Sequence, residues 1–133
     1  MATLFEKLQL KGHQQILVLN APQSFEIELS RLPILHIHRS LEAVPEIGFS
    51  LAFVTKQAEV DTLAAKIVAR AKGDAAVWFA YPKGSSKKLK CDFNRDTGWA
   101  MLQQAGFDTV RSIAIDEDWT ALRFRRKEFI NSR

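Results

Sequence analysis

Residues 60–81 read VDTLAAKIVARAKGDAAVWFAY, a pattern that predicts a helix followed at once by a buried strand. The helix is indicated by apolar residues on one face at helical spacing, with Gly73 where a helix commonly ends. Residues 75–81 are apolar at every position, which is typical of a strand covered on both faces in a parallel sheet. The helical stripe consists of Val60, Leu63, Ala64, Ile67, Val68 and Ala71.

The same pattern recurs on both sides of this stretch. Short apolar runs at residues 15–20, 34–38 and 49–54 predict three more strands. Phe25, Leu29 and Leu32 have the spacing of a short helix, and residues 39–48 have no clear period and are expected to be a connection. Residues 95–105 are expected to form a helix that Asn94 caps and Gly106 ends. Alternating strands and helices predict an α/β fold with a largely parallel sheet between helices.

The C-terminal part predicts a β-hairpin. Residues 109–115 and 119–125 have strand character, and Asp116-Glu117-Asp118 between them makes a tight acidic turn. With 133 residues, the chain has the length of one domain.

Composition excludes several classes of protein. The hydrophobic share of 47% and the charged share of 26% are ordinary for a soluble globular chain. Cys91 is the only cysteine, so no intrachain disulfide can form, and no apolar run approaches the ~20 residues of a membrane span. Residues 1–12 lack the apolar core of a signal peptide. We therefore expect a cytoplasmic protein.

The order of elements resembles the Rossmann-like fold of class I methyltransferases. The resemblance covers residues 17–125 and is carried by the strands at 16–19 and 76–79 and by Gly106-Phe107 before the terminal pair. It implies a three-layer α/β sandwich, a mostly parallel sheet of about six strands in the order 2-1-3-4-6-5, and an antiparallel last strand. We expect residues 1–133 to form this single Rossmann-like domain. Segments 17–22, 81–83 and 119–124 also resemble an uncharacterised bacterial family of small proteins with a domain of unknown function.

Two departures from the methyltransferase pattern concern the cofactor. The resemblance implies a glycine-rich turn after the first strand and an acid after the second strand that holds the ribose. This chain has Asn20-Ala21-Pro22-Gln23-Ser24 at the first place and His38-Arg39-Ser40 at the second. Both departures argue against S-adenosylmethionine and against a nicotinamide dinucleotide, so we predict no cofactor.

The candidate site lies at the carboxyl edge of the sheet, where open α/β sheets bind ligands. A small anion could bind to Lys83, Ser85, Ser86 and the first amides of the helix at Arg95, because lysines and helix N-termini favour negative charge. The alternative is a solvated loop whose lysines are neutralised by the acidic turn. The residues that we expect to contact a ligand at this edge are Asn20, Pro22, Thr55, Tyr81, Lys83, Ser85, Ser86, Arg95 and Trp119.

The other candidate functional residues fit structural roles better than functional ones. His36 and His38 share a strand face, but a zinc site needs a third ligand that the sequence does not place there. Cys91 beside Lys90 could have a lowered thiol pKa, but no histidine base can be assigned to it. Asp92 fits a helix start better than a catalytic role. We therefore predict no catalytic residue and no metal site, and we expect Trp78, Trp99 and Trp119 to be buried.

These observations favour a non-catalytic module that binds a small anionic ligand or a protein partner. A divergent S-adenosylmethionine-dependent methyltransferase, in which Asn20 and Tyr81 help to hold cofactor and substrate, is the enzyme alternative. A weak nucleic-acid binder is the third, although the net charge of +4 is small and no binding motif is present. An exposed edge strand could also pair two copies of the chain. The nucleic-acid hypothesis depends on Lys83, Lys87, Lys88, Lys90, Arg123 and Arg125.

Overall fold

The computed structural model describes residues 4–8, 15–31, 36–84, 90–93 and 98–130. Its strands are β1 (Gln15–Leu19), β2 (His36–His38), β3 (Ile47–Phe53), β4 (Ala71–Pro82), β5 (Phe107–Ala114) and β6 (Trp119–Arg126). Its helices are α1 (Leu4–Lys7), α2 (Gln23–Leu29), the 3-10 helix η1 (Leu41–Ala43), α3 (Gln57–Arg70), α4 (Ala100–Gln104) and α5 (Lys127–Ile130).

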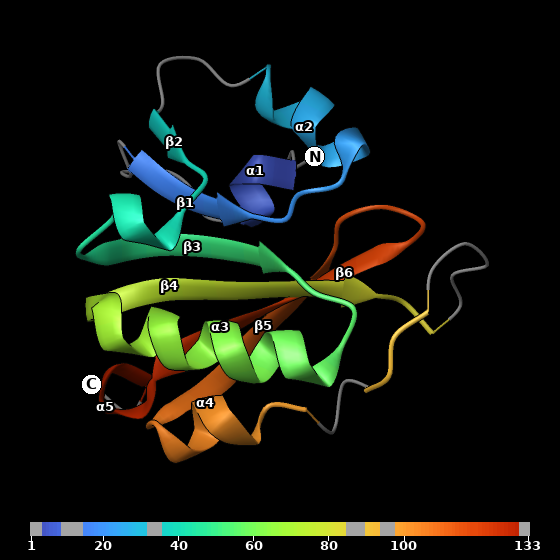
Figure 1. The fold of residues 1–133 in the computed structure, drawn as a ribbon. Helices are drawn as coiled ribbons and strands as arrows, with labels where there is room; N and C mark the ends of the chain where they lie inside the picture. The colour runs from blue at the N-terminus through green and yellow to red at the C-terminus, as the bar shows by residue number, and fades with distance from the viewer. Residues whose placement is uncertain (1–3, 9–14, 32–35, 85–89, 94–97, 131–133) are drawn as a thin grey trace.

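The six strands form one mixed sheet in the order β2-β1-β3-β4-β6-β5 (Figure 1). The pairs β1–β2, β1–β3 and β3–β4 are parallel, whereas β6 runs antiparallel to both β4 and β5. The predicted strand order and the antiparallel last strand are therefore confirmed. The acidic turn at residues 116–118 joins β5 to β6, as the sequence predicts.

From Ala75 onward, strand β4 lies between two hydrophobic cores, which is why this part of its sequence is apolar without alternation. Ala76, Trp78 and Ala80 face one core, to which α2 contributes Phe25 and Leu29. The residues that alternate with them, Val77, Phe79 and Tyr81, face the second core, to which α3 and α4 contribute. Helices thus cover both faces of the sheet, with α3 and α4 together on one of them (Figure 1).

Helix α3 corresponds to the predicted helix, but it begins and ends at other residues than predicted. Val60, Ala64 and Ile67 of the apolar stripe are fully buried, as their spacing requires. The helix begins at Gln57, three residues before the stripe, and ends at Arg70. The prediction that Gly73 ends it is wrong: the backbone is already extended at Ala71, and Gly73, with a φ of 57°, bends the first part of β4.

The predicted helix at 95–105 is shorter in the structure. Residues 94–97 lie outside the described part, and α4 begins only at Ala100. Gly98, at a φ of 96°, is held out of the helix because its carbonyl accepts a bond from Gln57 Nε2 at 2.9 Å. Trp99 then turns into the core beside Phe93. Gly106, at a φ of 91°, follows the end of α4, as predicted.

The remaining differences are small. The connection at 39–48 contains η1 and the first residues of β3. Residues 34 and 35 of the second predicted strand, and Leu32 of the first predicted helix, lie outside the described part.

Candidate functional site

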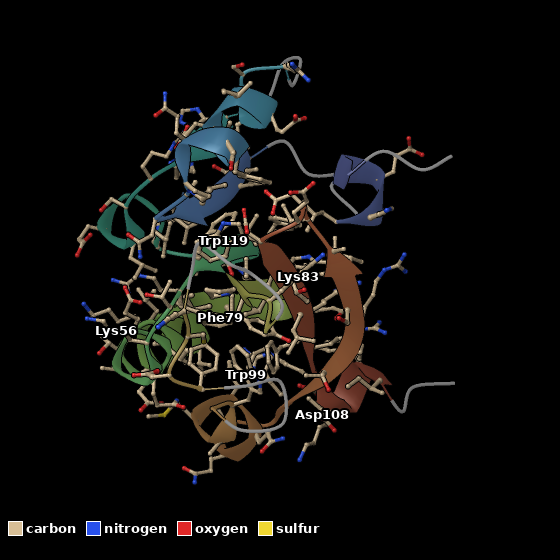
Figure 2. The ribbon with its side chains drawn as sticks, turned by 90° about the vertical axis from the view of Figure 1, so that its right-hand side faces the viewer. Lys56, Phe79, Lys83, Trp99, Asp108 and Trp119 are labelled. Carbon is tan, nitrogen blue, oxygen red and sulfur yellow. The ribbon has the colours of Figure 1, made fainter. Side chains whose placement is uncertain are left out.

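The candidate site is the carboxyl edge of the parallel strands, which faces the viewer in Figure 2. Asn20 follows β1, Thr55 lies just beyond β3, Lys83 follows β4, and Trp119 opens the antiparallel β6 at the same edge. The topology therefore brings these four predicted residues to one edge. Ser85, Ser86 and Arg95, the other part of the predicted anion site, lie outside the described residues.

Asn20 turns the chain between β1 and α2. Its φ of 58° is in the left-handed region, and it is the one non-glycine residue in the described chain with a positive φ. Asparagine is among the few residues that adopt this conformation readily. Helix α2 then begins at Gln23, and the carbonyl of the N-cap residue Pro22 accepts bonds from Phe25 N and Glu26 N, both at 3.0 Å. The turn is thus made without the glycine that the methyltransferase pattern has here.

A hollow of about 350 Å³ lies between this turn and the first half of α3. It has the volume of a small-ligand site, near the lower end of the usual range. Among the described residues, Asn20 is the one predicted site residue in its lining, and α3 contributes the others, which were not predicted as site residues. The residues that line it are Asn20, Ala58, Glu59, Thr62 and Leu63.

Two carboxylates of the protein occupy the N-terminus of α3. Glu59 Oε1 accepts bonds from Thr55 N at 2.8 Å and Lys56 N at 3.1 Å, and it also accepts from the Thr55 hydroxyl at 3.2 Å. Asp92 Oδ1 accepts from Gln57 N at 2.6 Å, across 35 residues of sequence. The backbone amides of Thr55, Lys56 and Gln57 at the start of this helix therefore already have anionic partners. Thr55, predicted to contact a ligand, contributes to this cap.

Tyr81 and Trp119 are both buried, at 6% and 7% exposure. The Tyr81 ring packs against Phe93 and Trp99 in the core under α3 and α4, with ring centroids 5.9 and 5.7 Å apart. Trp119 belongs to the opposite core, where its ring lies edge-on to Phe53 at 5.0 Å. Because the two rings lie on opposite faces of the sheet, they do not form one wall of a cleft. Trp78 and Trp99 are also buried, as predicted.

Lys83 lies directly beside the acidic turn. Its backbone N–H donates to the Asp118 carbonyl at 2.8 Å. Asp116 Oδ1 organises the turn by accepting bonds from Asp118 N at 2.8 Å and Trp119 N at 2.9 Å. The backbone of Lys83 is therefore adjacent to the acidic turn, and Lys83 itself lies at the edge that faces the viewer in Figure 2.

Arg39 stands at the place after β2 where the methyltransferase pattern has an acid. Its guanidinium is ion-paired with the Glu26 carboxylate of α2. The pair links the end of β2 to the helix that follows β1. A positive charge, already matched by a carboxylate, thus occupies the position expected to hold ribose hydroxyls.

The remaining candidates form no reactive site in the described chain. Burial raises the pKa of the Cys91 thiol, which is opposite to the lowering that a neighbouring lysine would cause. The His36 and His38 rings stack at 4.4 Å, and His38 Nε2 lies 2.9 Å from Gln15 Oε1. Among the described residues, no group of three His, Cys, Asp or Glu side chains could hold a metal ion.

The basic residues of the nucleic-acid hypothesis lie at two ends of the sheet. Lys83 follows the last residue of β4, whereas Arg125 binds Asp74 near the start of that strand. Nine residues of extended chain, roughly 30 Å, separate Asp74 from Lys83. Lys87 and Lys88 lie outside the described residues.

In the part of the chain that the structure covers, no helix is long and apolar enough to cross a membrane.

Comparison with known proteins gives likenesses in structure alone. No family model and no curated protein matches the sequence. A SAM-dependent methyltransferase from Aquifex aeolicus superposes with a TM-score of 0.60 at 13% identity, over 91% of this chain and 86% of that one. The N-methyltransferase NodS from Bradyrhizobium japonicum gives 0.57 at 12% identity, over 92% of each chain. A ribosomal protein L11 methylase from Lactobacillus delbrueckii gives 0.56 at 10% identity, over 93% of this chain and 77% of that one. The protein therefore has the Rossmann-like fold of class I methyltransferases.

Proposed function

We propose that the protein is a non-catalytic binding module on a methyltransferase-like fold, with its ligand site at the carboxyl edge of the sheet. The observation that carries the proposal is the Arg39–Glu26 ion pair. It puts a matched cation where related folds need a free carboxylate for the cofactor ribose. A hollow is nevertheless present beside Asn20, at the end of the neighbouring strand β1.

The lining of the hollow suggests the chemistry of the ligand. Ala58, Leu63 and the methyl of Thr62 offer an apolar surface, and Glu59 disfavours an anionic group inside it. Lys56 and Lys83 stand on the same edge outside the hollow. We infer a small ligand with an apolar body in the hollow and a negative charge toward these lysines. An apolar side chain of a protein partner with a neighbouring acid would have the same chemistry.

The test fills the hollow from an exposed position. In Ala58→Phe the new ring would occupy the hollow, whereas Ala65→Phe adds the same ring at an exposed position of α3 outside it. We expect octanoate, an apolar carboxylate, to bind the wild-type protein and Ala65→Phe in calorimetry, and to bind Ala58→Phe at least tenfold more weakly. Equal binding by both variants, or no binding by the wild type, would reject the hollow as the site.

A divergent S-adenosylmethionine-dependent methyltransferase is the second candidate. The left-handed backbone of Asn20, next to the hollow, favours it, because asparagine here adopts the positive φ that glycine readily provides. Tyr81, the other residue of this hypothesis, has its ring in the aromatic core. Titration with S-adenosylhomocysteine at millimolar concentration distinguishes the two functions. Saturable heat that Ala58→Phe abolishes would favour the enzyme, and a flat titration would remove it.

A further inference from the structure

Helix α3 presents three kinds of side chain to the hollow and its rim in a fixed order. Lys56 is the N-cap residue of the helix and lies outside the hollow, whereas Glu59 and Leu63 line it. At a rise of about 1.5 Å per residue, the three positions are about 4.5 and 6 Å apart along the helix axis. A cation, a hydrogen-bond acceptor and an apolar side chain therefore follow one another along this wall.

The two carboxylate oxygens of Glu59 have different surroundings. Oε1 accepts all three bonds of the helix cap, from Thr55 N, from the Thr55 hydroxyl and from Lys56 N. No group among the described residues donates a hydrogen bond to Oε2, although Glu59 is partly buried and lines the hollow. A carboxylate oxygen in such a place is stabilised by a hydrogen-bond donor. A ligand with an N–H group in the hollow would supply that donor.

The negative charge of the ligand belongs outside the hollow, toward the lysines. The backbone amides of Lys56 and Gln57 at the start of α3 already bind the carboxylates of Glu59 and Asp92. A ligand carboxylate would have to displace one of these to reach the helix N-terminus. The ammonium groups of Lys56 and Lys83 are on the same edge of the sheet (Figure 2) and attract an anion without any such displacement.

The hollow is open to solvent, which favours one residue of a longer chain over an enclosed small molecule. Asn20, Ala58 and Thr62, which line the hollow, are all exposed residues. Sites for small molecules usually enclose roughly 70–90% of the surface of the ligand. An open hollow leaves room for a chain that continues from the bound residue into solvent. C-terminal carboxylates of protein chains are a recurring target of this kind of recognition.

We propose that the hollow binds the C-terminal residue of a protein partner and that this residue has an apolar side chain. Its carboxylate lies toward Lys56 and Lys83, its backbone N–H donates to Glu59 Oε2, and its side chain packs on Ala58 and Leu63. One carbon atom carries all three groups, which matches their spacing along the first turns of α3. The inference rests on the function proposed above, because it names the partner of the same hollow.

The test is calorimetry of the wild-type protein with a series of leucine derivatives. N-acetyl-L-leucine has all three groups of a C-terminal residue. N-acetyl-L-leucinamide lacks the carboxylate, 4-methylpentanoate lacks the N–H, and leucine has a free ammonium in place of the peptide N–H. We expect N-acetyl-L-leucine to bind at least tenfold more tightly than N-acetyl-L-leucinamide, and at least fivefold more tightly than 4-methylpentanoate and leucine.

The outcomes separate this inference from the function on which it rests. Tighter binding of leucine than of N-acetyl-L-leucine would make a free amino acid the ligand and overturn the proposal. Equal affinity for N-acetyl-L-leucine and 4-methylpentanoate would also overturn it, because the N–H would then make no contact, but the hollow would remain a site for apolar carboxylates. If neither 4-methylpentanoate nor octanoate binds, the function proposed above fails together with this inference.

A variant of Glu59 tests the contact itself. Glu59→Gln keeps one carbonyl oxygen for the cap of α3 and replaces the other oxygen with an NH2 group, which cannot accept a hydrogen bond. It should bind 4-methylpentanoate at least as tightly as the wild type and lose the preference for N-acetyl-L-leucine. Glu128→Gln removes the same charge from an exposed residue of α5 and should keep that preference. A preference that persists in Glu59→Gln, that disappears in both variants, or an equal weakening of both ligands in Glu59→Gln would reject the contact.

Discussion

Asn20 sets the geometry of the candidate site with one backbone angle. A φ of 58° strains residues with a Cβ, by roughly 1–2 kcal/mol, except for the few that tolerate it. We expect Asn20→Ala to lower the free energy of unfolding by about 1 kcal/mol, and Asn20→Gly to leave it unchanged or raise it slightly. Urea unfolding followed by circular dichroism measures both changes.

The control for Asn20 is a neighbouring exposed residue with ordinary backbone angles. Gln23→Ala at the start of α2 should change the unfolding free energy by no more than about 0.5 kcal/mol. If Asn20→Ala proves as stable as Asn20→Gly, the left-handed turn is not a constraint on this position.

Ser50 is a buried hydroxyl in the middle of the sheet. It is 0% exposed, lies between Leu17 of β1 and Val77 of β4, and its Oγ has no hydrogen-bond partner in the described chain. A buried polar group without a partner costs about 1–3 kcal/mol. We therefore expect Ser50→Ala to keep or raise the free energy of unfolding, by up to about 1 kcal/mol.

Thr55 is the matched comparison for Ser50, because its hydroxyl donates to Glu59 in the cap of α3. Thr55→Val should lower the free energy of unfolding by about 1 kcal/mol. A loss of that size in Ser50→Ala would mean that the Ser50 hydroxyl has a partner after all. Thermal unfolding of both variants in one buffer decides between the two outcomes.

The roles of the site residues were harder to predict from the sequence than the positions of the strands. Asn20 and Arg39 could be singled out because they follow predicted strands. Their actual roles depend on backbone angle and on Glu26, thirteen residues away from Arg39. Glu59 accepts from Lys56 N as in a capping box, but the cap residue is a lysine and not the serine or threonine of that sequence signature. Asp92 reaches α3 from 35 residues away. No local pattern contains that contact.

At the scale of elements, the local sequence pattern was sufficient to predict a helix or strand wherever burial is continuous along that element. The stripe on α3 and the apolar run of β4 identified both elements, because each buries a whole face or both faces. The helix predicted at 95–105 failed at its start because tertiary contacts of Gly98 with Gln57 and of Trp99 with Phe93 outweigh local helix preference. Ends of elements are therefore where the sequence was least informative.

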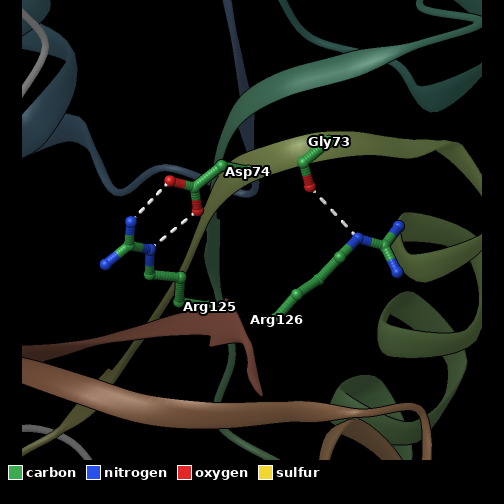
Figure 3. A network of polar contacts seen from close by, with 4 residues as sticks. All are labelled: Gly73, Asp74, Arg125 and Arg126. Carbon is green, nitrogen blue, oxygen red and sulfur yellow. Dashed lines mark hydrogen bonds and ion pairs between the residues drawn. The ribbon is translucent and has the colours of Figure 1, made fainter. Parts of the chain in front are cut away.

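The Asp74–Arg125 contact joins two strands at the start of β4 and predicts a pH effect (Figure 3). The hydrogen bond from Arg125 holds the pKa of the Asp74 carboxyl below its ordinary value. A lowered carboxyl pKa in the folded state adds stability above the ordinary pKa, near 4, and loses it as the pH falls further. Since both side chains are about one-third exposed, the contribution should be only about 0.5 kcal/mol.

Asp74→Asn measures that contribution. The wild type should be more stable than Asp74→Asn at pH 7, and the difference between their urea midpoints should shrink below about pH 4. High salt should also reduce the difference, because the pair is partly exposed to solvent. A difference that stays constant from pH 7 to pH 3 would show that the Asp74 charge is not its source.

For the molecule as a whole, the central sheet lies between two hydrophobic cores and contributes side chains to both. Adjacent residues of β4 contribute to opposite cores, so neither core can open without disturbing this strand. The tryptophans report on both sides, with Trp99 in the core under α3 and α4 and with Trp78 and Trp119 in the other. We propose that residues 1–133 unfold as one cooperative unit.

Tryptophan variants test this unit directly. Trp99→Phe leaves the two reporters of one core, and Trp78→Phe combined with Trp119→Phe leaves the single reporter of the other. In each protein, the urea transition measured by tryptophan fluorescence should coincide with that protein's own far-ultraviolet circular dichroism transition, because a two-state domain loses all structure together. Comparison within each variant removes the effect of the substitutions on stability. If fluorescence of Trp99 changed before the circular dichroism while the other reporters did not, the core under α3 and α4 would unfold separately.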